Sequence, residues 1–454
     1  MSVDLAVRRD ELRAAAPSPL TRGLRFELVK LLSLWRIRLL VALCWTAPAA
    51  FVAVVGRQSS LPTDTVFGRW MHASGWAGSL VVLGFACTWV LPLLTALVAG
   101  DVFAAEDRLG TWRQLLVAVR SPRRIFVAKA LASLTVVVLA VVGLAVAATA
   151  GGLASAGDRP LVGLDGHLLT AGEAARTVLL AWLSVLAPTL AFAGVGLLGS
   201  VALGRSPMGL LAPAVLAFVL QLAQLLPLPA ALRLALPSNA FLAWRGLVTA
   251  PPQLGPLLAG LAVSAAWAFL ATALAYRLFV RRDFTDTTYD GSGRRVLTAG
   301  ALPLAALLGL SVAVVAVATP VAGSGIDRAK LEDSLTTSFS HLYVLQTEEL
   351  HRPAVSEAQL HATTRCDKGG DAVEDTGPGN DWRCVVTWTL PGATATGTAL
   401  YQLDVTADGR YVADGDGPKE VNGSFRVRTP TGDAPNPLWQ VDGNLDLLTS
   451  SSKG

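Results

Sequence analysis

The sequence predicts an all-α polytopic membrane protein with about seven transmembrane helices, followed by a small extracytoplasmic α+β domain. Hydrophobic residues make up 52% of the 454 residues and the mean hydropathy is +0.51, which is more apolar than a soluble chain of this length needs. Charge is also unevenly divided: residues 1–320 carry 26 basic and 14 acidic side chains, whereas residues 321–454 carry 11 and 19. The two parts are therefore expected to face different surroundings.

The transmembrane prediction rests on seven apolar runs, each near or above the roughly 20 residues that cross a bilayer as a helix. They comprise residues 39–55, 76–99, 130–152, 177–203, 208–232, 254–276 and 296–321. The predicted domains are an N-terminal region 1–38, a six-span core 39–280, a linker with the seventh span 281–321, and a C-terminal domain 322–454.

An amphipathic helix is predicted before the first span. Leu24, Leu28, Leu31 and Trp35 fall on one helical face, and basic residues lie beside them, a pattern typical of a helix on the surface of the inner leaflet, where it meets membrane lipids. The alternative is that this stretch merely extends the first span.

The distribution of basic residues predicts the orientation. With the N-terminus inside, the inner segments hold 20 Arg and Lys residues and the short outer loops hold 6. The positive-inside rule then places the N-terminus in the cytoplasm and the C-terminal domain outside the plasma membrane. Arg makes up 31 of the 37 basic residues, which suits a GC-biased bacterial proteome better than a nucleic-acid binder. No cleavable signal peptide is expected, because residues 1–23 are polar.

A charged stretch, residues 101–129, separates the second and third runs. Thr111 and Gln114 have the T-x-x-Q spacing of a capping box, which predicts a helix from Trp112, and Gly110 allows the chain to turn into it. Ser121-Pro122 is expected to end this helix and to begin the next. The short helix would have one apolar face, with helical spacing, formed by Trp112, Leu115, Leu116 and Val119.

This stretch resembles the cytoplasmic coupling loop of ABC transporter permeases of the type-two export family. The resemblance is carried by Glu106, Gly110-Thr111, Leu115-Leu116, an Arg/Ser/Pro cluster, and Lys129 before a span. The family usually has Pro-Val-Ser-Arg where Val119-Arg120-Ser121-Pro122-Arg123-Arg124 stands here. The alternative is a basic, solvated loop between two spans.

The resemblance implies partners that the residues alone do not specify. In that family the loop docks on a separate ATP-binding cassette subunit, which binds ATP and Mg, and the permease pairs with a second copy or a related permease. It implies coupling roles for Glu106, Gly110, Thr111, Trp112, Leu115, Leu116, Arg124 and Lys129. If this helix docks on a partner, we expect that partner to bury its apolar face, because in a lone permease Trp112, Leu116 and Val119 would lie against water or lipid headgroups.

A broken apolar segment, residues 225–248, follows the fifth run. It is interrupted by Pro227, Pro229 and Pro237 and is too short to span twice, and it resembles the family's outer-side pair of short half-membrane helices, ending near Arg245. The alternative is an outer loop lying on the headgroups. The resemblance covers residues 24–280.

Two glutamines, Gln221 and Gln224, lie at near-helical spacing in the fifth run and are candidates for a substrate path. Such groups more often bond to a neighbouring helix. No ionisable side chain interrupts the cores of spans two to five, which argues against an ion-coupled carrier. The sequence also lacks a phosphate-binding loop, so ATP hydrolysis is expected in a partner and the chain itself is not expected to be an enzyme.

The C-terminal domain is predicted to contain a helix over residues 327–352 and strands near residues 359–366, 383–390, 399–405, 411–413 and 424–428. Asp408-Gly409 predicts a hairpin turn. Cys366 and Cys384 are expected to form a disulfide outside the membrane, and Cys44 and Cys87 to be buried thiols.

The remaining polar residues of the chain predict no further chemistry. The acidic residues Asp404, Asp408, Asp414 and Asp416 are expected to form a solvated face. The five histidines share no metal-ligand spacing, so no metal site is expected, and no catalytic group or nucleic-acid module is recognisable.

Together these observations predict the membrane-spanning subunit of an ATP-driven exporter. The alternative is a membrane-anchored envelope sensor or binding protein whose extracytoplasmic domain carries the function. An integral-membrane enzyme is a third and weaker possibility, because no catalytic constellation is present. The sequence does not identify the substrate.

Overall fold

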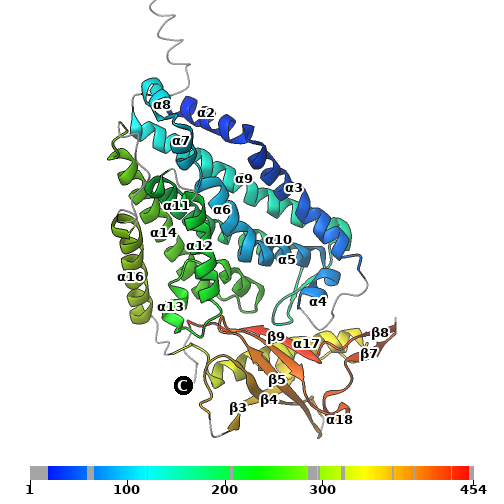
Figure 1. The fold of residues 1–454 in the computed structure, drawn as a ribbon. Coiled ribbons are helices and arrows are strands. Elements are labelled where there is room, and N and C mark those ends of the chain that lie inside the picture. Colours follow the sequence, from blue (N-terminus) through cyan, green and yellow to red (C-terminus); the bar gives the residue numbers. More distant parts are fainter. Residues whose placement is uncertain are drawn as a thin grey trace, which may run out of the picture.

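The structure is a computed structural model that describes residues 19–58, 66–119, 121–204, 208–284, 294, 297–318, 323–370, 373–392, 394–430 and 432–448. A bundle of long helices makes up one part of the molecule. A domain that contains a β-sheet lies against one end of this bundle, whereas α2, α7 and α8 lie at the other end (Figure 1). Two cysteines of the bundle, Cys44 and Cys87, are buried free thiols, as predicted.

Six helical regions of the described chain are long and apolar enough to cross a membrane. In chain order these regions are α3 (Trp35–Val55), α5 to α6 (Gly75–Ala99), α9 (Pro122–Ala156), α10 to α11 (Ala171–Leu203), α14 (Leu254–Val280) and the region Leu297–Ala318, which contains α16 (Leu302–Ala318). The mostly helical membrane architecture predicted from the sequence is therefore confirmed.

The fifth predicted run differs from the other six. Its helix α12 (Met208–Ala223) has 16 residues and stops well before the predicted end at residue 232. Pro227 and Pro229 follow, and proline cannot continue a helix because it lacks a backbone donor and clashes with the preceding turn. Within the described residues, a shorter helix and a broken segment thus take the place of the predicted fifth span.

That broken segment folds into short helices that are buried in protein. It contains α13 (Ala230–Leu234) and the 3₁₀ helices η2 (Asn239–Phe241) and η3 (Ala243–Val248), and most of their side chains are buried. The guanidinium of Arg233 donates to the backbone carbonyl oxygen of Gln224 at 2.7 Å and to that of Leu226. The short-helix prediction is confirmed, and a loop lying free on the surface is excluded.

Two of the spans are bent in the middle. In the second span, α5 (Gly75–Phe85) passes through a π-helical turn, η1 (Ala86–Val90), into α6 (Leu91–Ala99), where Pro92 follows at once. In the fourth span, Val185 separates α10 (Ala171–Ser184) from α11 (Leu186–Leu203).

The predicted N-terminal amphipathic helix is a separate element. Helix α2 (Pro19–Ser33) ends one residue before Leu34, and α3 begins at Trp35, so α2 does not extend the first span. It packs along α9, with Glu27 and Leu31 buried. Its position on a lipid surface remains a prediction.

The segment between α6 and α9 forms two short helices, α7 (Ala104–Leu109) and α8 (Trp112–Val119). Gly110 lies between them with a φ of 67°, a left-handed conformation that favours glycine, and so confirms the predicted turn. Helix α8 begins at Trp112 and α9 at Pro122, both as predicted. The hydroxyl of Thr111, expected to cap α8, donates to the carboxylate of Glu106.

Three small elements complete the bundle. Helix α4 (Val66–Ala73) precedes α5, and the paired strands β1 (Leu161–Val162) and β2 (Leu168–Leu169) connect α9 to α10. The π-helical turn η4 (Leu297–Ala301) precedes α16.

The C-terminal domain packs one helix on an antiparallel sheet. Helix α17 (Arg328–Glu349) begins after Asp327, whose carboxylate accepts a hydrogen bond from the backbone N–H of Lys330 at 2.9 Å. The sheet has the strand order β3-β4-β5-β6-β9, and α17 contacts β3 and β9. Its buried core includes Phe339, Trp382 and Tyr401.

The predicted strands are all present, and two were missed. The strands are β3 (His361–Lys368), β4 (Gly379–Thr389), β5 (Thr396–Val405), β6 (Arg410–Gly415), β7 (Arg426–Thr429), β8 (Gly432–Pro435) and β9 (Gln440–Asn444), with short helices η5 (Glu357–Gln359) and α18 (Lys419–Asn422). The turn between β5 and β6 contains Asp408-Gly409, as predicted. Both missed strands are short and lack an alternating apolar pattern.

Candidate functional site

Three buried carboxylates lie at the end of the bundle formed by α2, α7 and α8. Asp101, Glu106 and Asp107 follow the second span, and all three are almost completely excluded from solvent. A buried ionised carboxylate is costly unless a cation and hydrogen bonds compensate it. Each of the three has such partners, and these come from different helices.

Glu106 is held by two lysines and a hydroxyl. Lys129 Nζ of α9 donates to Glu106 Oε1 at 2.7 Å, and Lys30 of α2 and the hydroxyl of Thr111 also donate to this carboxylate. Lys129, only 1% exposed, also donates to Glu27 Oε2 of α2 at 2.9 Å. One ammonium group therefore connects α2, α7 and α9.

The surroundings of Glu106 favour its ionised form. Burial by itself raises the pKa of this carboxyl, but the charge of Lys129 and the hydrogen bonds from Lys129, Lys30 and Thr111 outweigh it. The result is a pKa lowered from 4.5 to about 2. The carboxylate is thus charged at physiological pH.

Asp107 connects α7 to the chain that follows α14. Arg282 donates to both carboxylate oxygens, with Nη1 2.8 Å from Oδ2 and Nη2 2.5 Å from Oδ1, a bidentate pair. The indole N–H of Trp112 donates to Oδ1 at 2.7 Å. The Trp112 ring also packs against the rings of Phe279 and Phe284.

Asp101 is paired nearer to the surface. Arg36 of α3 donates to one of its oxygens, and Arg108 Nη1 lies 3.5 Å from the other. We call the complete set the ion-pair cluster. Its members are Glu27, Lys30, Arg36, Asp101, Glu106, Asp107, Arg108, Lys129 and Arg282.

The structure brings some predicted site residues together and separates others. Glu106, Thr111 and Lys129 are in direct contact, whereas Arg124 is exposed at the start of α9. Leu115 and Leu116 are half-buried against the bundle.

The expectation that Trp112 needs a partner for its burial is wrong. The side chain is only 6% exposed in the single chain, because Phe279, Phe284 and Asp107 already surround it. The apolar side chains of this region that do face outward are Leu109, 67% exposed, Val117, 76% exposed, and Val119 of the predicted apolar face, 38% exposed.

Most of the ion-pair cluster was not recognised from the sequence. The prediction for the helix that contains Glu27 rested on its apolar residues alone. Asp101 and Asp107 lie in the charged stretch but belong to no recognisable motif. Arg282 lies 175 residues from Asp107, and no local pattern connects them. An available signal was that Asp101, Glu106 and Asp107 are the acidic residues between positions 65 and 157, a stretch dominated by two spans, so each needs a cation.

A second candidate region lies at the opposite end of the bundle, between the spans and the C-terminal domain. It is a cavity of about 690 Å³. Gln221 and Gln224, the predicted path residues, both line it. Gln221 Nε2 also donates to the carbonyl of Cys87 at 3.0 Å, and Gln224 Nε2 donates to Ser238 Oγ at 2.8 Å. Both glutamines therefore also bond to a neighbouring segment, which is the alternative to a role in a substrate path.

An ion pair joins the two parts of the molecule beside this cavity. Arg245 Nη1 of η3 lies 2.5 Å from Asp408 Oδ2 of the β5–β6 turn. Burial raises the pKa of Asp408, but Arg245 and the Thr406 hydroxyl, with a smaller contribution from Arg410, outweigh it and lower the pKa to about 2. The expectation that Asp408 belongs to a solvated face is therefore wrong.

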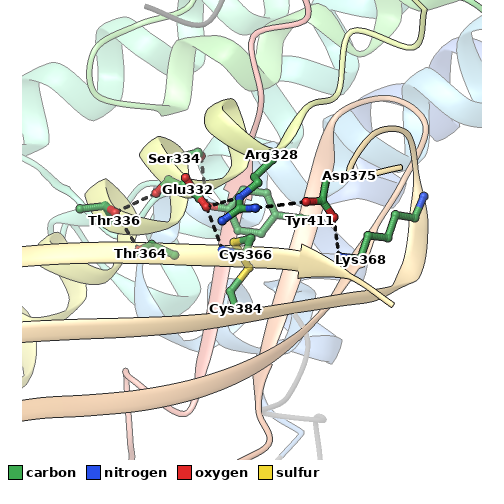
Figure 2. The surroundings of a disulfide bond; sticks show 10 residues. All are labelled: Arg328, Glu332, Ser334, Thr336, Thr364, Cys366, Lys368, Asp375, Cys384 and Tyr411. Carbon is green, nitrogen blue, oxygen red and sulfur yellow. Dashed lines mark hydrogen bonds and ion pairs between the residues drawn. A yellow bond between two sulfur atoms is a disulfide. The ribbon is translucent and has the colours of Figure 1, made fainter. Parts of the chain in front are cut away.

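The predicted disulfide is present in the C-terminal domain. Cys366 and Cys384 are bonded and occupy directly paired positions of β3 and β4. Figure 2 shows how α17 lies beside it: Glu332 accepts a hydrogen bond from the backbone N–H of Cys366 at 3.0 Å and another from Arg328 at 2.8 Å. The disulfide thus reinforces the edge of the sheet next to α17.

Comparison with known proteins identifies the membrane part. Residues 24–224, from α2 to the end of α12, match the model of a family described as ABC-2 family transporter protein. No curated protein matches the chain. The matched region contains every member of the ion-pair cluster except Arg282, and the described part of the chain has six helical regions long and apolar enough to span a membrane. The match over residues 24–224, together with these membrane-capable helices, supports an ABC-2 type permease.

Proposed function

We propose that this chain is the membrane-spanning subunit of an ATP-driven exporter and that a separate ATP-binding cassette subunit docks on α7 and α8. The family of residues 24–224 supports a permease. A membrane-anchored sensor would use its spans only as an anchor and would not need charged groups buried at the base of the bundle. In the exporter, the chain pairs with a second copy or a related permease, and it carries out no bond chemistry itself.

The ion-pair cluster is the observation that carries this proposal. Helices α7 and α8 are short and lie outside the spans, yet buried charges connect them to α2, α9 and the end of α14. Such pairs are directional and costly to break, so a displacement of α7 moves these helices with it. The cluster can therefore transmit movement of a docked subunit into the spans.

The exposed side of α7 and α8 is the proposed contact surface. Leu109 and Val117 are apolar and largely exposed, and Arg113 and Arg124 are exposed beside them. An apolar centre with charged surroundings is the usual composition of a protein interface. Trp112 holds α8 in position from below instead of binding the partner.

Co-purification from the native host tests the proposal. The unmutated chain, solubilised in detergent, should recover an ATP-binding protein and stimulate its ATPase activity. Val117→Glu places a charge in the proposed interface and should reduce recovery about thirtyfold or more, since hot-spot changes cost at least about 2 kcal/mol.

Val373→Glu is the matched control, because Val373 is also exposed but lies in the C-terminal domain. It should leave recovery unchanged. If the unmutated chain recovers no ATP-binding protein, or if both variants behave like it, the exporter proposal fails and the membrane-anchored sensor becomes the better account.

The orientation is part of the same proposal: the N-terminus and the ion-pair cluster lie in the cytoplasm, and the C-terminal domain lies outside the plasma membrane. The excess of basic residues in the predicted inner segments supports it. Single cysteines at positions 2 and 451, which lie outside the described residues, should react from opposite sides with a membrane-impermeant thiol reagent. Labelling of both from one side of intact cells would contradict this orientation.

A further inference from the structure

The cavity between the spans and the C-terminal domain has two unlike walls. One wall is apolar and aromatic and comes from the spans, with Trp89 of η1, Phe218 and Leu222 of α12, and Leu225 after it. The other wall is polar and comes from the β5–β6 turn and from Arg245 of η3. The volume of about 690 Å³ is within the range that holds a drug-sized or lipid-like molecule.

The polar wall carries an excess of positive charge. Arg245, Arg410 and Asp408 line it, which gives a net charge of +1. Asp408 is already engaged by Arg245. Within the described part of the chain, the guanidinium of Arg410 forms no hydrogen bond or salt bridge, although it is only partly exposed. Burial and the neighbouring charge of Arg245 lower the pKa of Arg410, against smaller opposing effects of Asp408 and Asp404. An anion in the cavity would give the guanidinium a hydrogen-bonded partner.

Amides complete the lining between the two walls. Gln221 of α12 and Gln224, which directly follows it, belong to the lining. The amide of Gln221 can offer a further donor or acceptor to a polar linker. A neutral apolar molecule would leave the guanidinium of Arg410 desolvated and unpaired, which is unfavourable. A small hydrophilic anion would leave the aromatic wall without contacts.

We propose that this cavity binds an anionic amphiphile, with its acidic group at Arg410 and its apolar body against Trp89 and Phe218. One part of this inference rests on the proposed function: that the bound compound is also the transported one. The C-terminal domain then supplies half of the site, because the permease spans alone would present the apolar wall without Arg410.

Binding of a brominated fatty acid tests the site. The protein is placed in nanodiscs of phosphatidylcholine at alkaline pH and titrated with 12-bromododecanoate, because bromine quenches the fluorescence of a nearby indole. Trp89→Phe identifies the part of the signal that comes from the cavity wall. We expect saturable quenching of Trp89 by the acid, and at least about tenfold weaker binding of its uncharged methyl ester.

Variants of Arg410 separate charge recognition from folding. Arg410→Gln should weaken binding of the acid at least about tenfold, whereas Arg410→Lys should restore most of it. Arg383→Gln, an exposed change on β4 of the same domain, should have no effect. If phosphatidylglycerol in the nanodisc displaces the acid, the site holds an anionic membrane lipid, and if it does not, the site holds a smaller amphiphile.

Equal quenching by the acid and its ester, or unchanged binding in Arg410→Gln, would overturn the proposal. The measurement needs neither nucleotide nor an ATP-binding subunit. Its failure therefore leaves the proposed function standing, and failure of the co-purification leaves the anion site standing.

Discussion

The two ends of the helix bundle differ in how they use charge. At the α7–α8 end, the acidic groups are buried and each one is paired, and the space beside Glu27 and Glu106 is only about 40 Å³. At the other end, Arg245 and Asp408 are partly exposed beside a cavity of about 690 Å³. The first end is closed and held by buried ion pairs, whereas the second end is open.

This difference indicates where the molecule can move. Breaking a buried, hydrogen-bonded ion pair is expensive, so the ion-pair cluster should move as a unit. A partly exposed pair contributes little and can separate at low cost. In the exporter that we propose, the closed end receives movement and the open end changes shape.

The largest expected effect is that of Lys129→Ala. It removes the ammonium from between Glu27 and Glu106 and leaves two buried carboxylates without their shared partner. We expect a loss of about 3 to 5 kcal/mol of stability, measured by thermal or denaturant unfolding in detergent.

The pH dependence of stability tests the same cluster. Because the folded-state pKa of Glu106 is lowered to about 2 from 4.5, its contribution is present above pH 4.5 and is lost as the pH falls toward 2. The variant Glu106→Gln should lack that part of the pH dependence. An unchanged acid transition in Glu106→Gln, or full stability in Lys129→Ala, would show that the cluster is not the rigid element of this end.

Truncation of Trp112 should come next. Trp112→Ala removes a buried ring from between Phe279 and Phe284, together with the hydrogen bond to Asp107, and should cost about 3 kcal/mol in unfolding experiments. Val117→Ala, on the exposed side of the same helix, should cost less than about 0.5 kcal/mol. Equal stability of the two variants would mean that α8 is not held by the bundle.

Loss of the disulfide should act at the open end alone. The two cysteines are separated by 18 positions, and a loop of that size contributes roughly 3 kcal/mol in the chain-entropy model. The double variant Cys366→Ser, Cys384→Ser should therefore raise hydrogen exchange in β3 and β4 and leave α9 protected. If peptide mapping without reductant finds both thiols free in the unmutated protein, the disulfide between Cys366 and Cys384 is contradicted.

The smallest expected effect is that of Arg245→Ala. The pair with Asp408 is partly exposed, so its loss should cost less than that of Lys129, on the order of 1 to 2 kcal/mol. Hydrogen exchange at the β5–β6 turn should nevertheless increase, because this pair connects the turn to η3. A loss as large as that of Lys129→Ala would remove the distinction between the two ends.

The sequence predicted local structure well and contacts between distant segments poorly. Apolar runs predicted the spans because a bilayer requires about 20 apolar residues whatever the partners are. Gly110 and Pro122 predicted the turn and the helix start because their backbone preferences act locally. The pairing of Cys366 with Cys384 could be predicted because only two cysteines lie in the polar part.

The candidate sites required three-dimensional information. Arg282 meets Asp107 across 175 positions, and Arg245 meets Asp408 across 163, so no periodicity reveals either pair. The apolar face of α8 was predicted, but periodicity cannot distinguish burial against Phe279 from burial against a partner. The end of α12 was misplaced because hydrophobicity continues through Pro227 although the helix does not.

Distance measurements across the cavity test the central claim, which is that nucleotide bound at the closed end reshapes the open end. Spin labels would be placed at Leu225 and Ala407, on opposite walls of the cavity, with Cys44 and Cys87 replaced by alanine. In the complex with the co-purified ATP-binding subunit, a hydrolysis-resistant ATP analogue should shift the distance distribution, and Lys129→Ala should abolish the shift. Identical distributions with and without nucleotide in the unmutated complex would contradict the account.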